Sequence, residues 1–222
     1  MKNKLFFISF LVFAGLSVNA QYYTAGSAKT LAPGKVSLGL SPYYMLPITE
    51  TELYSSTAGI NGIFGYGIAE GIDFHVIGGI LRAKPTANAE DTTYTKFYGA
   101  AEAEFQLIAT GKREKPGFAA SFTTGVHSWQ SLAGFDALLN LTFRQNRHLY
   151  YYSGFDVDYN IELETDANSN ISRTGKLYYG VPAGIEIRPS EYTSLILEGK
   201  IPISKNTAYF IGAGIELVLN PK

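Results

Sequence analysis

Hydrophobic and polar residues alternate one by one along much of this chain. In Tyr94–Ala109 one row of alternate residues is small or apolar, and the other row carries every charge. Side chains of a strand point alternately to two faces, whereas a helix would scatter both sets around its circumference. This stretch therefore predicts one long strand with an apolar face and a polar face.

The same alternation recurs along most of the chain. It covers residues 35–44, 118–127, 135–144, 149–159, 177–188, 192–201 and 208–219, and residues 59–81 hold two strands around the turn Ala69-Glu70-Gly71. Short links mostly alternate with longer, more polar ones, the longest being residues 160–174. The pattern predicts an all-β fold, a closed antiparallel up-and-down transmembrane β-barrel of about ten strands, within a range of about 8–12.

Aromatic residues on the apolar row fall into two bands. One band lies near the expected long loops and the other near the short turns: Tyr44, Phe97, Phe135, Tyr159, Tyr179 and Tyr209, and then Tyr66, Phe74, Phe105, Phe118, Phe143 and Tyr151. Membrane barrels carry such aromatic girdles at the two bilayer interfaces, with short turns on the periplasmic side. A soluble lipocalin-like carrier would alternate equally, with its apolar row inside. The two bands favour the membrane arrangement.

The start of the chain and its composition set the domain organisation. Lys2 and Lys4 precede an apolar run, and Val18-Asn19-Ala20 predicts signal-peptide cleavage after Ala20. A membrane-anchoring helix would need about 20 apolar residues, more than this run supplies. We expect a signal peptide (1–20), a short periplasmic N-terminal segment (21–34) and one barrel domain (35–222). Charged residues make up 17% of the chain and aromatic residues 14%. The net charge is -1, so no nucleic-acid-binding surface is expected. Because Cys is absent, no thiolate metal site is expected.

With these features the chain resembles the small, porin-like outer-membrane β-barrel proteins of Gram-negative bacteria. The resemblance covers residues 35–219 and rests on the strand pattern. It implies the cell outer membrane as location, outer-membrane lipids and lipopolysaccharide as surroundings, and the barrel-assembly machinery as partner. Many such barrels end on an aromatic residue, whereas this chain ends in Leu219-Asn220-Pro221-Lys222.

The polar row predicts a charged lumen. Its candidate polar cluster comprises Lys96, Glu102, Glu104, His127, Asp136, Arg144, Asp156, Glu186, Arg188, Glu198 and Lys200, with Asp73 and Asp158 as further inward charges. We expect His127 near Asp136, and Asp156 beside Asp136. Such a site resembles that of the omptin-like barrel proteases, because a carboxylate beside a histidine can act as a general base. A hydrogen-bonded network of lumen charges is the alternative that we favour, and no enzymatic activity is expected.

No cofactor is expected, and no histidine pair has metal-ligand spacing. The expected function is a narrow channel or a barrel that binds or transports a small polar solute; the alternative is a structural or adhesion barrel with a plugged lumen. For closure, we expect Lys35 to lie near Glu216, and Ser37 and Gly39 to adjoin Gly214 and Gly212.

Overall fold

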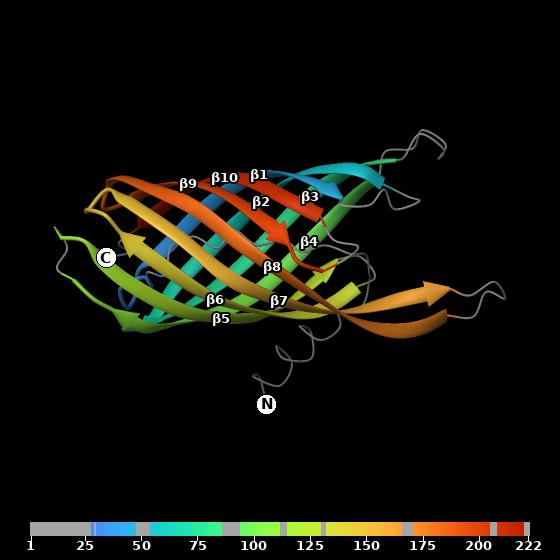
Figure 1. Cartoon of the computed structure of the whole chain (residues 1–222), viewed down its shortest axis with the longest axis horizontal. Helices are drawn as coiled ribbons and strands as arrows, with labels where there is room; N and C mark the ends of the chain where they lie inside the picture. The colour runs from blue at the N-terminus through green and yellow to red at the C-terminus, as the bar shows by residue number, and fades with distance from the viewer. Residues whose placement is uncertain are drawn as a thin grey trace, which may run out of the picture.

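A computed structural model describes residues 28, 30–47, 54–85, 94–111, 115–129, 132–165, 171–204 and 208–219. These residues form ten antiparallel strands (Figure 1). The strands are β1 (Val36–Pro47), β2 (Tyr54–Ala69), β3 (Ile72–Pro85), β4 (Tyr94–Ala109), β5 (Gly117–Trp129), β6 (Leu132–Arg144), β7 (Leu149–Thr165), β8 (Ile171–Ser190), β9 (Thr193–Pro202) and β10 (Ala208–Leu219). Within the described ranges, no helix is long and apolar enough to span a membrane.

The sheet closes on itself, because β1 pairs with β10 as well as with β2. A closed barrel leaves no strand edge with unpaired backbone groups, as a lipid environment requires. Closure is as predicted, but the predicted register is wrong by four residues: Ser37 lies opposite Val218, not Gly214, and Gly39 lies opposite Glu216. Lys35 lies with its Nζ 5.8 Å from the ring centroid of Tyr192.

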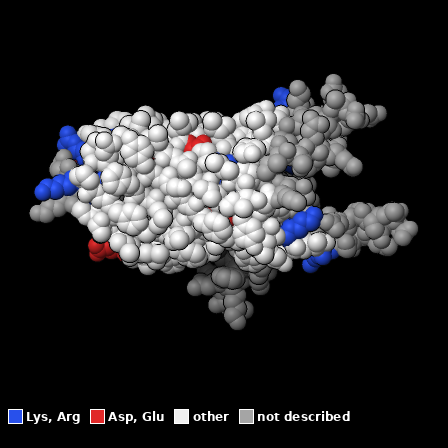
Figure 2. Space-filling model, in the orientation of Figure 1, with Lys and Arg blue, Asp and Glu red and all other residues white. Residues whose placement is uncertain are grey.

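Burial in this barrel is inverted relative to a soluble protein. Among the described residues, 38 large apolar or aromatic side chains are exposed, and most of them stand on the outward row of a strand. The buried side chains are 20 polar or charged ones and 13 hydrophobic ones. A soluble barrel would bury its apolar row, so the lipocalin-like alternative does not fit. Figure 2 shows the outer wall as a largely uncharged surface, with Lys and Arg mainly towards the two ends.

The predicted aromatic residues all stand on this outward row. Eleven of the twelve are exposed, and Tyr179 is half-buried, with its ring stacked on that of Phe155 at 6.1 Å between centroids. Cross-strand pairs such as Phe118 with Phe143 and Phe135 with Tyr159 keep each band at one level of the wall. Their position relative to a bilayer stays a prediction.

Two ends of the barrel can be told apart by their connections. Links β2–β3, β4–β5, β6–β7 and β8–β9 lie at one end, here called the short-turn end, together with the start of β1 and the end of β10. The β2–β3 turn needs Gly71, whose φ of 75° is readily adopted only by glycine. The remaining links define the opposite, long-loop end.

The predicted long loop at residues 160–174 is mostly strand. β7 continues to Thr165 and β8 begins at Ile171, and these ends pair with each other. Pairing of β7 with β6 reaches only Ile161, and pairing of β8 with β9 only Gly180. Hence residues 162–165 and 171–174 form a two-stranded ribbon beyond the closed wall, seen as the projecting orange hairpin in Figure 1. Their polar composition suggested a loop, but a ribbon edge in water tolerates polar residues equally well.

Candidate functional site

All eleven residues of the predicted polar cluster project into the lumen. Arg144 and Arg188 are half-buried, and the other nine are buried. They do not form a single site. Instead, the strand registers divide them into separate groups along the barrel, each with its own partners.

His127 on β5 and its neighbours form the group nearest the long-loop end. The His127 Nδ1 atom lies 3.4 Å from Asp136 Oδ1, and Nε2 lies 2.7 Å from the side-chain oxygen of Asn160. The expected neighbour relation of His127 and Asp136 is therefore present. However, Asp158, not Asp156, lies opposite Asp136 on β7. Both ring nitrogens of His127 are thus held by buried side chains.

Lys200 on β9 is the centre of the second group. Its Nζ donates hydrogen bonds to Asp156 and, at 3.2 Å, to Asp158. These three residues are at most 5% exposed. One cation thus serves two buried carboxylates. Glu198, two residues before Lys200, accepts a hydrogen bond from Tyr152 at 2.7 Å.

Two arginines belong to the short-turn end. Arg188 pairs with Glu186, which also accepts a hydrogen bond from Ser194 at 2.7 Å. The Arg188 guanidinium lies 4.5 Å from the ring centroid of Tyr150. Arg144 donates to the backbone carbonyl of Lys115 at 3.2 Å. These contacts order the mouth of the barrel at its short-turn end.

An apolar cluster occupies part of the lumen towards the long-loop end. It comprises Tyr43, Met45, Ile77, Leu81, Tyr98, Ala100 and Phe210, on β1, β3, β4 and β10. The rings of Tyr43 and Phe210 stack at 5.7 Å between centroids. The polar row predicted a charged lumen, and this apolar cluster was not predicted. It packs the lumen on the side facing the His127 and Lys200 groups.

Residues before β1 fill part of the opposite, short-turn end. Ala28 is fully buried; its N–H donates to Thr142 Oγ1 at 2.7 Å, and its carbonyl accepts from Gln106 at 3.0 Å. The N–H of Leu31 donates to Asp73 Oδ2 at 2.5 Å. A Cβ on Gly67 would lie 2.3 Å from the Ala32 carbonyl oxygen, so glycine is needed for this close approach. The described residues of the segment before β1 thus lie inside this mouth of the barrel.

Between the apolar cluster and this mouth lies a cavity of about 570 Å³. Its lining extends from residues at the short-turn end, such as Pro33 and Glu191, to Ser41 and Ile77 farther inside the barrel. Its charged lining consists of seven carboxylates and three bases: Glu70, Asp73, Glu102, Glu104, Glu186, Glu191 and Glu216 against Lys35, Arg144 and Arg188. Formal charge therefore favours a cationic occupant.

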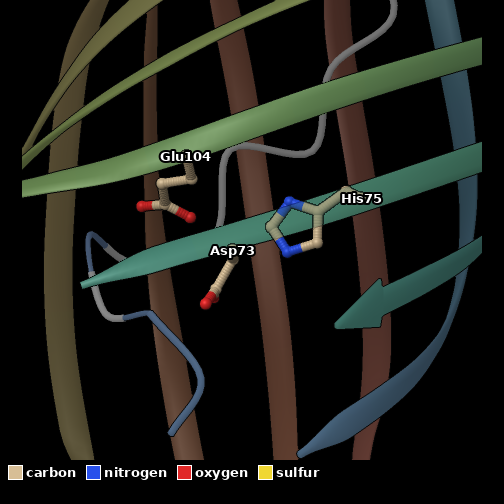
Figure 3. Close-up of side chains that lie close together, drawn as sticks. All are labelled: Asp73, His75 and Glu104. Atoms are coloured by element: carbon tan, nitrogen blue, oxygen red, sulfur yellow. The ribbon is translucent and has the colours of Figure 1, made fainter. Parts of the chain in front are cut away.

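Asp73, His75 and Glu104 come together on the wall of this cavity (Figure 3). Asp73 and His75 are two residues apart on β3 and share its inner face, and Glu104 on β4 lies directly opposite Asp73. One potential ligand atom from each residue lies within 4.8 Å of the others. This arrangement could hold a metal ion.

Sequence analysis missed this group because it compared histidines only with one another. The alternation did place Asp73, His75 and Glu104 on the inner row. The missing information was the pairing of β3 with β4, which sets Glu104 against Asp73. The tight Glu70-Gly71 turn fixes the direction of β3 but leaves that second pairing open.

The fold is that of outer-membrane β-barrels. An outer-membrane channel from Pseudomonas putida F1 is similar in structure, with a TM-score of 0.52, 9% sequence identity, and 89% of this chain and 100% of that chain covered. Ail of Yersinia pestis matches with a TM-score of 0.37 and 12% identity over 84% of this chain and 99% of that one. The N-terminal barrel domain of Pseudomonas aeruginosa OprF gives 0.34 and 11% over 82% and 97%.

No protein-family model matches the sequence, and no curated protein matches it. At 9% identity the similarity to the Pseudomonas putida channel supports the barrel architecture alone, so the function has to be argued from the residues of the lumen.

Proposed function

We propose that this protein is an outer-membrane barrel that binds a small polar solute, preferably a cation, in a lumen cavity open towards the periplasm. The observation that carries the proposal is the cavity of about 570 Å³ at the short-turn end, with its excess of carboxylates. Short turns face the periplasm in outer-membrane barrels, which gives the cavity its orientation. A cavity of this volume suits a small ligand.

The packing of the remaining lumen argues for a binding cavity over a wide pore. Barrels of about eight strands have interiors just filled by side chains, and open channels need about sixteen. Here the Lys200 group and the apolar cluster occupy the part of the lumen beyond the cavity. Passage of a solute through this part would require side chains to move, so we expect very low conductance in planar lipid bilayers.

Cysteine accessibility tests the cavity directly, because the chain contains no native Cys. Gly214 lines the cavity, and a Cβ there meets nothing closer than 3.7 Å. Ala100, buried in the apolar cluster, is the matched control. A small hydrophilic thiol reagent should modify Gly214→Cys and spare Ala100→Cys in the detergent-purified barrel. Protection of both would indicate a plugged structural barrel, and rapid modification of both would indicate an open channel.

A second candidate function, adhesion, is favoured by one observation. The β7–β8 ribbon extends beyond the closed wall at the long-loop end. In outer-membrane barrels the short turns face the periplasm and the longer loops face the cell exterior, so we expect the ribbon outside the cell. A projecting ribbon can offer its edges to another protein. Binding to host or neighbouring-cell surfaces that is lost when the ribbon is shortened would support this candidate.

We propose no catalytic role for His127 and Asp136. Both ring nitrogens of His127 have buried partners, which suits a structural network. His127→Ala should therefore lower folding stability by about 1–3 kcal/mol, because Asn160 and Asp136 lose a buried partner. A peptidase or lipase activity of the purified barrel that disappears in folded His127→Ala would contradict this view.

A further inference from the structure

We propose that Asp73, His75 and Glu104 bind one divalent transition-metal ion, with Zn²⁺ as the best-fitting example. The site deepens the proposed function, since it lies in the same cavity and names the class of cation held there. It stands on the geometry of the three side chains and on two buried carboxylate oxygens that lack a partner among the described residues, Asp73 Oδ1 and Glu104 Oε1.

The geometry comes from two paired strands. Asp73 and His75 project from the same face of β3, and Glu104 reaches them from the neighbouring strand β4 (Figure 3). Their candidate ligand atoms lie within 4.8 Å of one another. Ligands of a tetrahedral zinc ion, at about 2.0–2.2 Å from the metal, are about 3.4 Å apart. A small inward movement of the side chains would therefore complete the coordination.

Buried polar atoms that lack partners provide a separate indication of a ligand. Asp73 is 1% exposed and Glu104 is 7% exposed, yet Asp73 Oδ1 and Glu104 Oε1 have no hydrogen-bond partner within the described part of the chain. Neither carboxylate forms an ion pair with a described Lys or Arg, and no described group hydrogen-bonds to the His75 ring. Burying carboxylates without a counter-charge is expensive. A divalent cation would neutralise both at once.

The donor set selects the class of metal. One imidazole nitrogen with two carboxylate oxygens suits zinc and other borderline divalent ions, whereas all-oxygen sites suit Mg²⁺ and Ca²⁺. The chain has no Cys, so a soft thiolate site is not formed. Three protein ligands leave a fourth position, which would face the cavity and could take water or a solute.

Neighbouring residues leave room for the site and orient it. A Cβ on Gly65, opposite His75 on β2, would lie 2.9 Å from the imidazole, so glycine gives the ring its space. The Leu31 N–H bonds to Asp73 Oδ2, which leaves Oδ1 for an ion. Such hydrogen bonds commonly orient metal-binding carboxylates. Through this hydrogen bond, the segment before β1 would contact a residue that binds the metal.

Metal titration tests the proposal. The protein would be purified from membranes in detergent, stripped with a chelator and titrated with Zn²⁺ by isothermal calorimetry. We expect one Zn²⁺ per barrel, and affinity reduced by about 100-fold in Asp73→Asn, His75→Asn and Glu104→Gln. Control variants are Glu191→Gln, a cavity carboxylate outside the group, and His148→Ala, an exposed histidine, and both should bind like the wild type. Slower electrophoretic migration after heating would report that each variant is folded.

A second readout uses Co²⁺ in place of Zn²⁺. The wild type should give the visible absorption bands of four-coordinate Co²⁺, and His75→Asn should lose them. Absence of stoichiometric Zn²⁺ binding, or equal binding by folded Asp73→Asn and His75→Asn, would overturn the proposal. If Gly214→Cys is still modified in that case, the solute cavity stands without the metal. If Zn²⁺ binds while Gly214→Cys is protected, the metal site stands and the open cavity does not.

Discussion

Lys200 shows how single residues determine whether this lumen can be charged. Its ammonium is 3% exposed and lies between Asp156 and Asp158, which would otherwise repel each other inside the wall. Gly180 on β8 makes this possible, because a Cβ there would lie 2.5 Å from the Lys200 side chain. The buried cation, its two carboxylate partners and the glycine that makes room for it thus occupy four positions on three neighbouring strands.

Removing the Lys200 charge should therefore be costly. In Lys200→Met two buried carboxylates lose their cation, and loss of one partner of a buried ion pair typically costs about 3–5 kcal/mol. Denaturant unfolding in lipid or detergent would measure the loss. The matched control is Lys200→Met combined with Asp156→Asn and Asp158→Asn, which should recover much of the stability. Equal destabilisation of the single and triple variants would mean that packing, not charge, is the cause.

The two faces of the wall should also differ in their tolerance of a new charge. Leu139, on the outer face near the middle of β6, is 43% exposed, and Arg at such a lipid-facing position costs about 2–4 kcal/mol near the bilayer midplane. Gly214→Arg would instead place its charge in the carboxylate-lined cavity and should cost much less. Unfolding of both variants in lipid vesicles compares them. A larger loss of unfolding stability for Gly214→Arg than for Leu139→Arg would mean that Gly214 faces the lipid and Leu139 faces the lumen.

At the scale of elements, β7 and β8 are longer than the wall requires. β8 has 20 residues and β7 has 17, whereas β9 has 10. Their outer ends pair only with each other, so each strand of this ribbon has a neighbour on one side only. Elements of this kind add little to the closed wall and are available for contacts outside it.

Shortening the ribbon should leave the barrel intact. If an Asn-Gly turn replaces residues 163–173, Glu162 and Thr174 become the last paired residues of β7 and β8. The replacement removes no pairing of β7 with β6 or of β8 with β9. We expect unchanged unfolding stability, unchanged Zn²⁺ binding and normal heat-modifiable migration. A variant that fails to fold would show that the ribbon acts in assembly.

Local alternation was sufficient to predict the strands and their faces, because a period of two is a property of each segment alone. Register between strands was harder, since one strand can slide against another by two residues without changing its faces. For this reason Asp158 and not Asp156 meets Asp136, and the grouping of Asp73, His75 and Glu104 was not foreseen. The inward apolar residues Met45 and Leu81 break the rule that the inner row is polar.

At the scale of the whole molecule, the lumen is arranged in layers along the barrel axis. Residues before β1, the arginines and the carboxylates line the cavity at the short-turn end, and the apolar cluster and the Lys200 and His127 groups lie beyond it. Each layer combines side chains from strands distant in sequence. This arrangement depends on the pairing of β1 with β10, which closes the barrel.

Disulfide cross-linking between the first and last strands tests this closure and its register together. Cysteines at Ser37 and Val218, or at Gly39 and Glu216, occupy directly opposite inward positions on β1 and β10. Opposite residues in an antiparallel pair have Cβ atoms about 4.5–5.5 Å apart, close enough for oxidation to link them with small adjustments. Both pairs should cross-link within one chain, and faster migration on unreduced gels would show it.

The matched controls separate a wrong register from an open sheet. Cysteines at Ser121 and Asn140, opposite each other in the β5–β6 hairpin, should link in any folded form. Cysteines at Ser37 and Gly214 lie four residues out of register, about 13 Å along the strand, and should not link. Linkage of Ser37 with Gly214 but not with Val218 would mean that β1 and β10 pair in a register shifted by four residues, in which Glu216 is not opposite Gly39. Linkage of the hairpin control alone would mean that β1 and β10 do not meet, and an open edge of that kind could not lie bare in lipid.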